Sequence, residues 1–330
     1  EYDEAPYAAE IARHLGTDHL QQYVTANQAR DVIPRLHEIY DEPFADSSQI
    51  PTILISEMAR QFVTVALSGD GGDELFGGYP RYRLTTQLWR RLGKLPRRLR
   101  SIVRRPMPLA ARLLGRGTAI ARKLETLAHV LDVRDGAELY TRLHTHWKEP
   151  HLLVIDGQLP DAEFYRSEQW PSRGSLVEQL TYVDAISYLP DDILVKLDRA
   201  SMAVGLEART PLLDHRIVEF TWHLPAHVKF STDYPKSILK RVLTRHVPAP
   251  MLDRPKRGFG VPLQSWLRGP LREWAEALLD EKRLQREGFF HPQPIRRLWQ
   301  EHLQEKRNWH YYLWDILMFQ AWLENFRASR

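Results

Sequence analysis

The stretch VALSGDGGDELFGGYPRY, residues 65–82, decides the fold of this chain. Val65, Ala66 and Leu67 form a short apolar run that predicts a buried strand, and this run leads directly into glycines and carboxylates. In open α/β sheets, ligands bind at the carboxyl ends of parallel strands. Glycine lets the main chain approach a phosphate closely, and carboxylates can hold a divalent cation against that phosphate. The stretch therefore predicts a nucleotide site with bound magnesium.

A solvent-exposed turn is the alternative for the same residues, because Gly and Asp are ordinary turn residues. Residues 68–78, however, hold three acidic residues among five glycines, directly after the predicted strand. A turn exposed to water has no need of so many charges in so short a segment. We therefore favour the nucleotide site.

The bulk composition is that of an ordinary globular protein: of 330 residues, 43% are hydrophobic and 27% are charged. The chain contains no cysteine, which excludes disulfides, thiolate nucleophiles and Cys-type zinc sites. It shows neither a run long enough to span a membrane nor a signal peptide, so we expect a cytoplasmic protein. Because the first residue is Glu1 and not methionine, we also expect the chain to be part of a longer polypeptide.

Positive charge is concentrated in residues 89–123, which hold twelve of the 46 Lys and Arg residues and no acid. Such a basic block can bind nucleic acid or an anionic membrane. No aromatic residue interleaves the arginines after Trp89, and no nucleic-acid motif accompanies them. We therefore expect a solvated helical face or a mobile insertion, with neither nucleic acid nor a membrane as a partner.

Hydrophobic periodicity divides the chain into three segments. It indicates an α/β portion over residues 1–88, a basic helical region over residues 89–171, and a helical portion over residues 172–330 that completes the site. Asn27 is the expected N-cap of the second helix. Helices are predicted over residues 6–16, 27–40, 51–61, 175–189, 198–206, 236–246, 263–279 and 294–326, and strands over residues 20–24 and 62–67.

Three later segments combine charged residues with glycines or small apolar residues. The first is residues 188–220, in which charges are embedded in apolar sequence; such charges are usually paired or functional, although any single one on a helix is more often a solvated surface residue. Residues 234–243 carry Lys236, and residues 254–262 carry Lys256 beside glycines. A glycine loop that presents a lysine suits stabilisation of charge on a transferring phosphoryl or nucleotidyl group. The charged residues of these segments that bear on function are Asp191, Asp192, Lys196, Asp198, Arg199, Glu207, Arg209, Lys236, Lys240, Arg241, Arg254, Lys256 and Arg257.

Together these segments resemble a known family. SGDGGDELFGGY, YLPDDILVKLDRASMAVGLEARTPLLDH, PKSILKRVL and RPKRGFGVP, in this order and spacing, are similar to the synthetase domain of glutamine-dependent asparagine synthetases. The resemblance covers essentially the whole chain and is weakest between residues 89 and about 171. It implies an α/β fold, a partial ATP pyrophosphatase (adenine-nucleotide α-hydrolase-like) parallel sheet followed by a large helical portion.

The resemblance also implies an activity, that of an AMP-forming carbon–nitrogen ligase of asparagine biosynthesis. ATP and Mg²⁺ would activate the side-chain carboxylate of aspartate as β-aspartyl-AMP, and ammonia, supplied from glutamine, would displace AMP to give asparagine. This chemistry needs cations to offset charge on the phosphates and little covalent work from the protein.

Site residues follow from the resemblance position by position. Ser68 and Gly69 match the family's ATP-contacting pair, and Asp70 matches an acidic position needed to form the acyl-adenylate, where many relatives have Glu. Asp73 matches a magnesium ligand. Lys256 matches a lysine that stabilises charge in the transition state. The charged positions that match residues lining the same nucleotide site are Asp198, Glu207 and Arg209.

Two departures from the family pattern qualify these expectations. The pyrophosphate-binding loop SGGxDS does not occur in these residues, and neither does the N-terminal glutaminase domain with its cysteine nucleophile. We therefore expect the 330 residues alone to be inactive and the longer parent to use glutamine.

Several alternatives stay open. One is a related ligase that acts on another carboxylate of a sugar, peptide or β-lactam precursor; another is a non-catalytic interaction module. Asp46, Ser47 and Ser48 are a weak suggestion for the aspartate pocket. The oligomeric state is open, with a homodimer as one option.

Overall fold

A computed structural model describes residues 5–114, 118–158, 160–171, 174–230, 235–252 and 260–328. The chain divides into two compact units. The first unit is Glu1–Tyr40, Asp46–Pro80 and Asp184–Val261. The second unit is Asp41–Ala45, Arg81–Val183 and Pro262–Arg330. The glycine-rich stretch that decides the fold lies almost entirely in the first unit.

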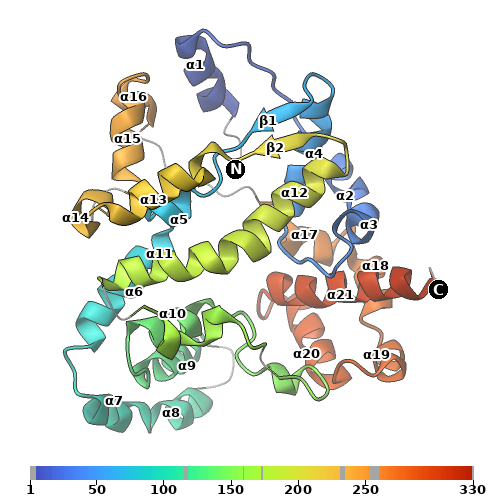
Figure 1. Cartoon of the computed structure of the whole chain (residues 1–330). Coiled ribbons are helices and arrows are strands. Elements are labelled where there is room, and N and C mark those ends of the chain that lie inside the picture. Colours follow the sequence, from blue (N-terminus) through green and yellow to red (C-terminus); the bar gives the residue numbers. More distant parts are fainter. Residues whose placement is uncertain are drawn as a thin grey trace. The chain divides into compact units, whose positions relative to one another are not determined.

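The first unit contains a pair of parallel strands. β1 (Val65–Leu67) pairs with β2 (Glu207–Arg209), so that Val65 lies opposite Glu207 and Leu67 lies opposite Arg209 (Figure 1). The helices of this unit are α1 (Ala5–Leu15), α2 (Ala26–Asp31), α3 (Leu36–Tyr40), α4 (Gln49–Arg60), α5 (Gly72–Phe76), α12 (Val195–Met202), α13 (His215–His223), α14 (Ala226–Lys229), α15 (Ser237–Leu243) and α16 (Ala249–Leu252). A π-helix (Leu189–Leu194) runs directly into α12, and 3-10 turns occur at Ile33–Arg35 and Pro211–Leu213.

The core of the first unit lies between α12 and the helices α3 and α4, which pack against it. Ile50 and Ile53 of α4 are fully buried, as is Ala200 of α12. Tyr40 of α3 is 1% exposed and donates a hydrogen bond from its hydroxyl to the Lys196 carbonyl oxygen at 3.2 Å. This packing fixes α12, and with it β2, which follows α12 in the chain.

The second unit is helical in its described residues. Its helices are α6 (Pro80–Leu92), α7 (Arg97–Arg104), α8 (Met107–Leu113), α9 (Ala119–Leu131), α10 (Gly136–His144), α11 (Leu176–Ile186), α17 (Leu263–Arg268), α18 (Arg272–Leu278), α19 (Glu281–Glu287), α20 (Pro292–Leu303) and α21 (His310–Ala328), with 3-10 turns at Pro150–Leu152, Glu163–Tyr165 and Ser167–Gln169. Pro80 of α6 and residues 184–186 of α11 belong to the first unit. Trp299 and Trp314 are fully buried where α20 packs on α21. None of the described helices is long and apolar enough to cross a membrane.

The α/β prediction is confirmed, since a small parallel sheet is combined with a large helical portion. The strand predicted over residues 62–67 is present as β1, which begins at Val65, but its predicted burial is wrong, because Leu67 is 73% exposed. The strand predicted over residues 20–24 is wrong: residues 18–25 have no regular structure, because no described strand pairs with them. The pattern of apolar residues in 20–24 is local, so it could not show that a neighbouring strand to pair with is absent from the described residues.

Helix boundaries also differ from those predicted. The N-cap of α2 is Thr25 and not Asn27, because the Thr25 side chain accepts a hydrogen bond from Gln28 N and the Gln28 side chain accepts one from Thr25 N. The helix predicted over residues 27–40 is interrupted by a 3-10 turn around Pro34. The helices predicted over residues 263–279 and 294–326 are each two helices, separated at Gly269 and after Leu303.

Candidate nucleotide-binding site

The carboxyl ends of β1 and β2 lie side by side. Ser68, the first residue after β1, donates its backbone N–H to the carbonyl oxygen of Arg209 at 2.7 Å. The glycine-rich stretch and the segment that carries Glu207 and Arg209 are therefore brought together at one sheet edge, although they are far apart in the sequence. This is the edge at which parallel sheets bind ligands.

The turn after β1 is shaped by glycines. Gly71 has a φ of 85°, in the left-handed region, and a Cβ there would lie 2.2 Å from Leu213 Cδ2. Gly69 is different, because nothing lies within 4 Å of the position of its missing Cβ. The main chain at Gly69 is thus open to an approaching group. Ser68 donates its hydroxyl hydrogen to the carboxylate of Asp70, and both side chains are half-buried.

Asp73, in the first turn of α5, forms an ion pair with Lys236. Asp73 Oδ2 lies 3.0 Å from Lys236 Nζ, and both side chains are partly buried. Lys236 precedes α15 and has a φ of 55°, a conformation that few non-glycine residues adopt. A Cβ on Gly78 would lie 1.9 Å from Asp73 Oδ1 and 2.4 Å from Lys236 Cε, so glycine at this position makes room for the pair. From the sequence, Lys236 was identified only as one of three basic residues in residues 234–243. Nothing in the sequence indicated its contact with Asp73.

Glu74, next to Asp73, is buried and hydrogen-bonded. It is 1% exposed, and the Tyr79 hydroxyl donates to Glu74 Oε1 at 2.6 Å. Burial raises the pKa of Glu74, and the nearby carboxylates of Asp73 and Asp184 act in the same direction. Burial and the Glu74 carboxylate also raise the pKa of Tyr79. This pair anchors the end of α5 beneath the turn.

Glu207 and Arg209 lie on the same side of β2, two residues apart. Arg209 Nε lies 2.7 Å from Glu207 Oε1, and both side chains are more than half exposed. An ion pair so exposed contributes little to stability. Because both side chains are exposed, both charged groups are accessible to a ligand. Asp198 is exposed on α12, and its carboxylate forms no hydrogen bond or ion pair with the described residues. Lys256 belongs to residues 253–259, which lie outside the described part of the chain.

A second ionic cluster connects the start of α4 to α12. Lys196 Nζ lies 2.6 Å from Asp46 Oδ2 and 3.8 Å from Asp192 Oδ1. Ser48 donates its backbone N–H to Asp46 Oδ1 at 2.9 Å and its hydroxyl to Oδ2 at 2.7 Å. Burial acts to raise the pKa of Asp46, but the Lys196 ammonium and the Ser48 hydrogen bonds outweigh it and hold the pKa below its ordinary value. The residues suggested for an aspartate pocket are thus part of an ordered charged cluster.

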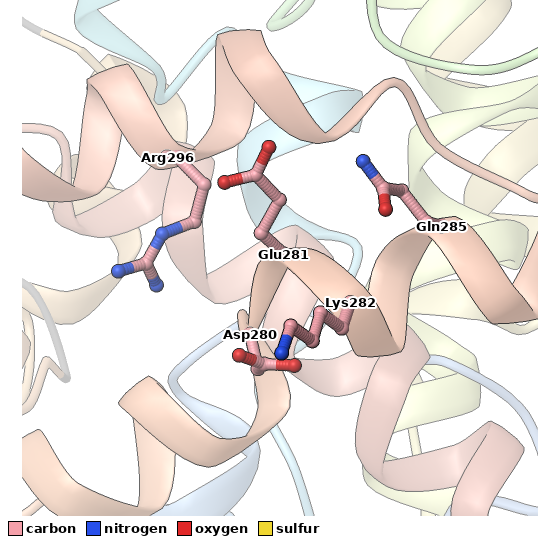
Figure 2. A pocket seen from close by; sticks show the side chains of 5 residues that line it. All are labelled: Asp280, Glu281, Lys282, Gln285 and Arg296. Carbon is pink, nitrogen blue, oxygen red and sulfur yellow. The ribbon is translucent and has the colours of Figure 1, made fainter.

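The second unit has a surface hollow of about 410 Å³ that includes none of the motif residues. Figure 2 shows its lining side chains, which come from α19, α20 and the residue before α19. They are Asp280, Glu281, Lys282, Gln285 and Arg296. Arg296 Nη2 already lies 2.6 Å from Glu276 Oε1, and Glu281 Oε1 accepts a hydrogen bond from Gln293. We assign no function to this hollow.

Comparison with known proteins identifies the family. A family model described as asparagine synthase matches residues 1–324. A glutamine-hydrolyzing asparagine synthetase 1 of Bacillus subtilis is 29% identical over 97% of this chain and 50% of its own length. A putative asparagine synthetase of Mycobacterium tuberculosis is 31% identical over 97% of this chain and 48% of its own length. A putative asparagine synthetase 2 of Methanocaldococcus jannaschii is 44% identical over 61% of this chain and 38% of its own length.

The chain spans about half the length of the curated relatives that it matches most fully. The matched family domain has an α/β, adenine-nucleotide α-hydrolase-like fold, to which the parallel pair of β1 and β2 corresponds. The chain therefore belongs to the asparagine synthase family.

Proposed function

We propose that this chain is the synthetase part of an ATP-dependent enzyme that converts aspartate into asparagine. In the first step, a side-chain carboxylate oxygen of aspartate attacks the α-phosphorus of ATP; an O–P bond forms and pyrophosphate leaves. In the second step, ammonia attacks the acyl carbon; a C–N bond forms, the bond to AMP breaks, and a proton is lost to solvent. The enzyme contributes mainly positioning and charge stabilisation.

One observation carries the proposal: the two motif segments meet at the carboxyl ends of β1 and β2, through the Ser68–Arg209 main-chain contact. The open main chain at Gly69 and the hydroxyl of Ser68 would contact the nucleotide. Asp70, oriented by its hydrogen bond from Ser68, would support formation of the acyl-adenylate.

The exposed charges of β2 and α12 would line the same nucleotide site. We assign Glu207 and Arg209 to it because they belong to β2, whose last residue is Arg209, and Asp198 because its carboxylate is exposed on α12, which precedes β2 in the chain. Positive charge would come from two lysines. Lys236 is held beside the turn by Asp73, and we assign Lys256 the role of offsetting charge on the leaving pyrophosphate.

Magnesium fits this site only as an ion shared with the substrate. The described residues contain no group of three or more His, Cys, Asp or Glu side chains that could hold a metal ion. Mg²⁺ is commonly bound by one or two carboxylates together with substrate phosphates. Asp73 would provide the protein ligand, and Lys236 would then exchange its Asp73 contact for a phosphate oxygen. When bound, Mg²⁺ would neutralise charge on the phosphates.

A complete site needs more than these residues. The sequence lacks the SGGxDS loop that binds pyrophosphate in the family. We propose that this loop, and the domain that releases ammonia from glutamine, belong to a longer protein that includes this chain. The 330 residues alone would then fail to adenylate aspartate.

The test is aspartate-dependent exchange of labelled pyrophosphate into ATP, measured with the longer protein. We expect exchange to require aspartate and Mg²⁺. Replacement of Asp70 or Lys256 by Ala should lower the exchange rate by about a hundredfold, the effect expected for one transition-state contact. Undiminished exchange in both variants would contradict the roles assigned here.

The same measurement separates the alternatives. Exchange that depends on a different carboxylate, and not on aspartate, would indicate the related ligase. A longer protein that binds neither ATP nor aspartate would indicate the interaction module.

A further inference from the structure

Helix α7 has its apolar side turned outward. Leu99, Ile102 and Val103 are 46%, 62% and 46% exposed. Arg100 of the same helix is 4% exposed and donates hydrogen bonds to the carbonyl oxygens of Leu131 at 3.3 Å and Val133 at 3.0 Å. A surface helix of a globular protein normally has the reverse arrangement, with its apolar stripe on the core. The outward stripe of α7 is therefore available to a partner.

The two following helices extend this apolar surface. α8 and α9 pack against each other and against α7, and Figure 1 shows α7 and α8 side by side. Leu109 is 62% exposed, Leu113 79% and Ile120 61%. We call Leu99, Ile102, Val103, Leu109, Leu113, Leu114 and Ile120, with the exposed cations Arg97, Arg98, Arg105 and Lys123, the basic–apolar surface. Such a patch of large aliphatic side chains marks an interaction site.

The charge of this surface selects among partners. Residues 89–123 contain no acid, so a second copy docked through the same face would bring arginines against arginines. An anionic partner is complementary. Nucleic acid is anionic, but its phosphate backbone gives the protruding Leu and Ile side chains nothing to contact, and residues 90–123 include no aromatic residue that could stack on bases. A peptide helix binds in a groove, whereas side chains up to 79% exposed protrude.

We propose that the basic–apolar surface binds the surface of an anionic lipid bilayer. The Leu and Ile side chains insert at the boundary between head groups and acyl chains, and the arginines pair with lipid phosphates, as in amphipathic helices that lie in the interface. The protein would thus attach peripherally through its second unit. This departs from the solvated face expected for residues 89–123 from their composition.

The test is flotation of the protein with lipid vesicles. One set is pure phosphatidylcholine; in the other, about a third of the lipid is phosphatidylglycerol, which supplies the anionic surface. We expect binding to the anionic vesicles only, weakened by added salt. Combining Leu99→Gln, Ile102→Gln and Leu113→Gln should abolish binding. Combining Arg97→Glu and Arg98→Glu should lower the vesicle partition coefficient by about tenfold or more, since each cation near the surface contributes to binding.

Matched controls come from the same unit. Leu152→Gln removes a 53% exposed leucine outside the surface, and Arg286→Glu reverses an exposed arginine on α19. Both should bind vesicles as the unchanged protein does. Circular dichroism and a thermal melt would verify that each variant is folded.

Three results would overturn the proposal. The first is equal binding to both vesicle types or to none. The second is binding to a labelled oligonucleotide that the arginine reversals abolish and the glutamine substitutions leave intact, which would indicate nucleic acid. The third is a dimer in sedimentation velocity that the glutamine substitutions dissociate, which would indicate a second copy.

Discussion

Glu74 is a buried acid in the middle of the glycine-rich stretch, and its surroundings oppose its ionisation. Burial raises its pKa above the ordinary value of 4.5. The folded state therefore binds the Glu74 proton more tightly than the unfolded state does. Glu74 therefore contributes to the stability of the folded state when it is protonated, below pH 4.5. This contribution is lost as the pH rises from 4.5 through the pKa of Glu74 in the folded state.

Glu74→Gln should remove this dependence. Glutamine keeps an oxygen that accepts the Tyr79 hydroxyl hydrogen but cannot ionise, so the variant should be more stable than the unchanged protein at neutral pH. Urea denaturation at several pH values measures the effect. Glu273→Gln, an exposed acid on α18, is the control and should leave the profile unchanged. A variant that is less stable at neutral pH would contradict the account.

The glycines of the turn have separable roles. Gly71→Ala would place a Cβ 2.2 Å from Leu213 Cδ2 at a positive φ, which should cost about 2–4 kcal/mol of stability from strain and overpacking. Gly69→Ala meets nothing within 4 Å, so stability should be preserved while ATP binding weakens. Thermal denaturation and ATP titration of the longer protein measure the two effects. Equal stability of the two variants would show that the turn is not packed as described.

At the scale of elements, the ion pair of Asp46 and Lys196 ties the start of α4 to α12. Each side chain is mostly buried, so loss of one partner leaves a charge in a poorly solvated place. Since α12 leads into β2, this contact helps to fix the positions of Asp198 and of the carboxyl end of β2 within the first unit.

Lys196→Met should destabilise the protein by about 2–3 kcal/mol, and the double variant Lys196→Met, Asp46→Asn by less, because it leaves no isolated charge. A double-mutant cycle in urea measures the difference. Asp46 has a lowered pKa, so its contribution is complete above the ordinary value of 3.8 and is lost as the pH falls below it. Additive effects of the two substitutions would mean that the pair is not coupled.

For the whole molecule, the sequence predicted β1 and its turn but not the strand pairing that brings the motif segments together. β1 and its turn were identified because glycines and acids directly follow an apolar run. β2 was missed, since Glu207, Ala208 and Arg209 carry no strand pattern and become a strand only by pairing with β1. The contact between Asp73 and Lys236 depends on a left-handed backbone at a lysine, which no local preference indicates.

The two-stranded sheet has exposed apolar side chains that additional residues of a longer protein would cover. Parallel sheets are normally covered on both faces, yet Leu67 of β1 is 73% exposed and Phe62 is 59% exposed. We expect a longer chain that includes the SGGxDS loop to cover Leu67. The 330 residues contain no cysteine, so Leu67→Cys is the one labelled position among them, and peptide mapping by mass spectrometry follows the same position in the longer chain. Maleimide should react fast in the 330-residue chain and slowly in the longer one, with Leu152→Cys fast in both. Equal rates for Leu67→Cys would contradict this expectation.

The proposed activation of aspartate, through its side-chain carboxylate as an AMP ester, can be followed with an isotope. If that carboxylate attacks the α-phosphorus of ATP, one of its oxygens stays on AMP when ammonia forms the amide. The longer protein, supplied with aspartate labelled with ¹⁸O in the side-chain carboxylate, should release AMP that carries one ¹⁸O for each asparagine formed, as measured by mass spectrometry. Unlabelled AMP, or label recovered in inorganic phosphate, would contradict the mechanism proposed for this chain.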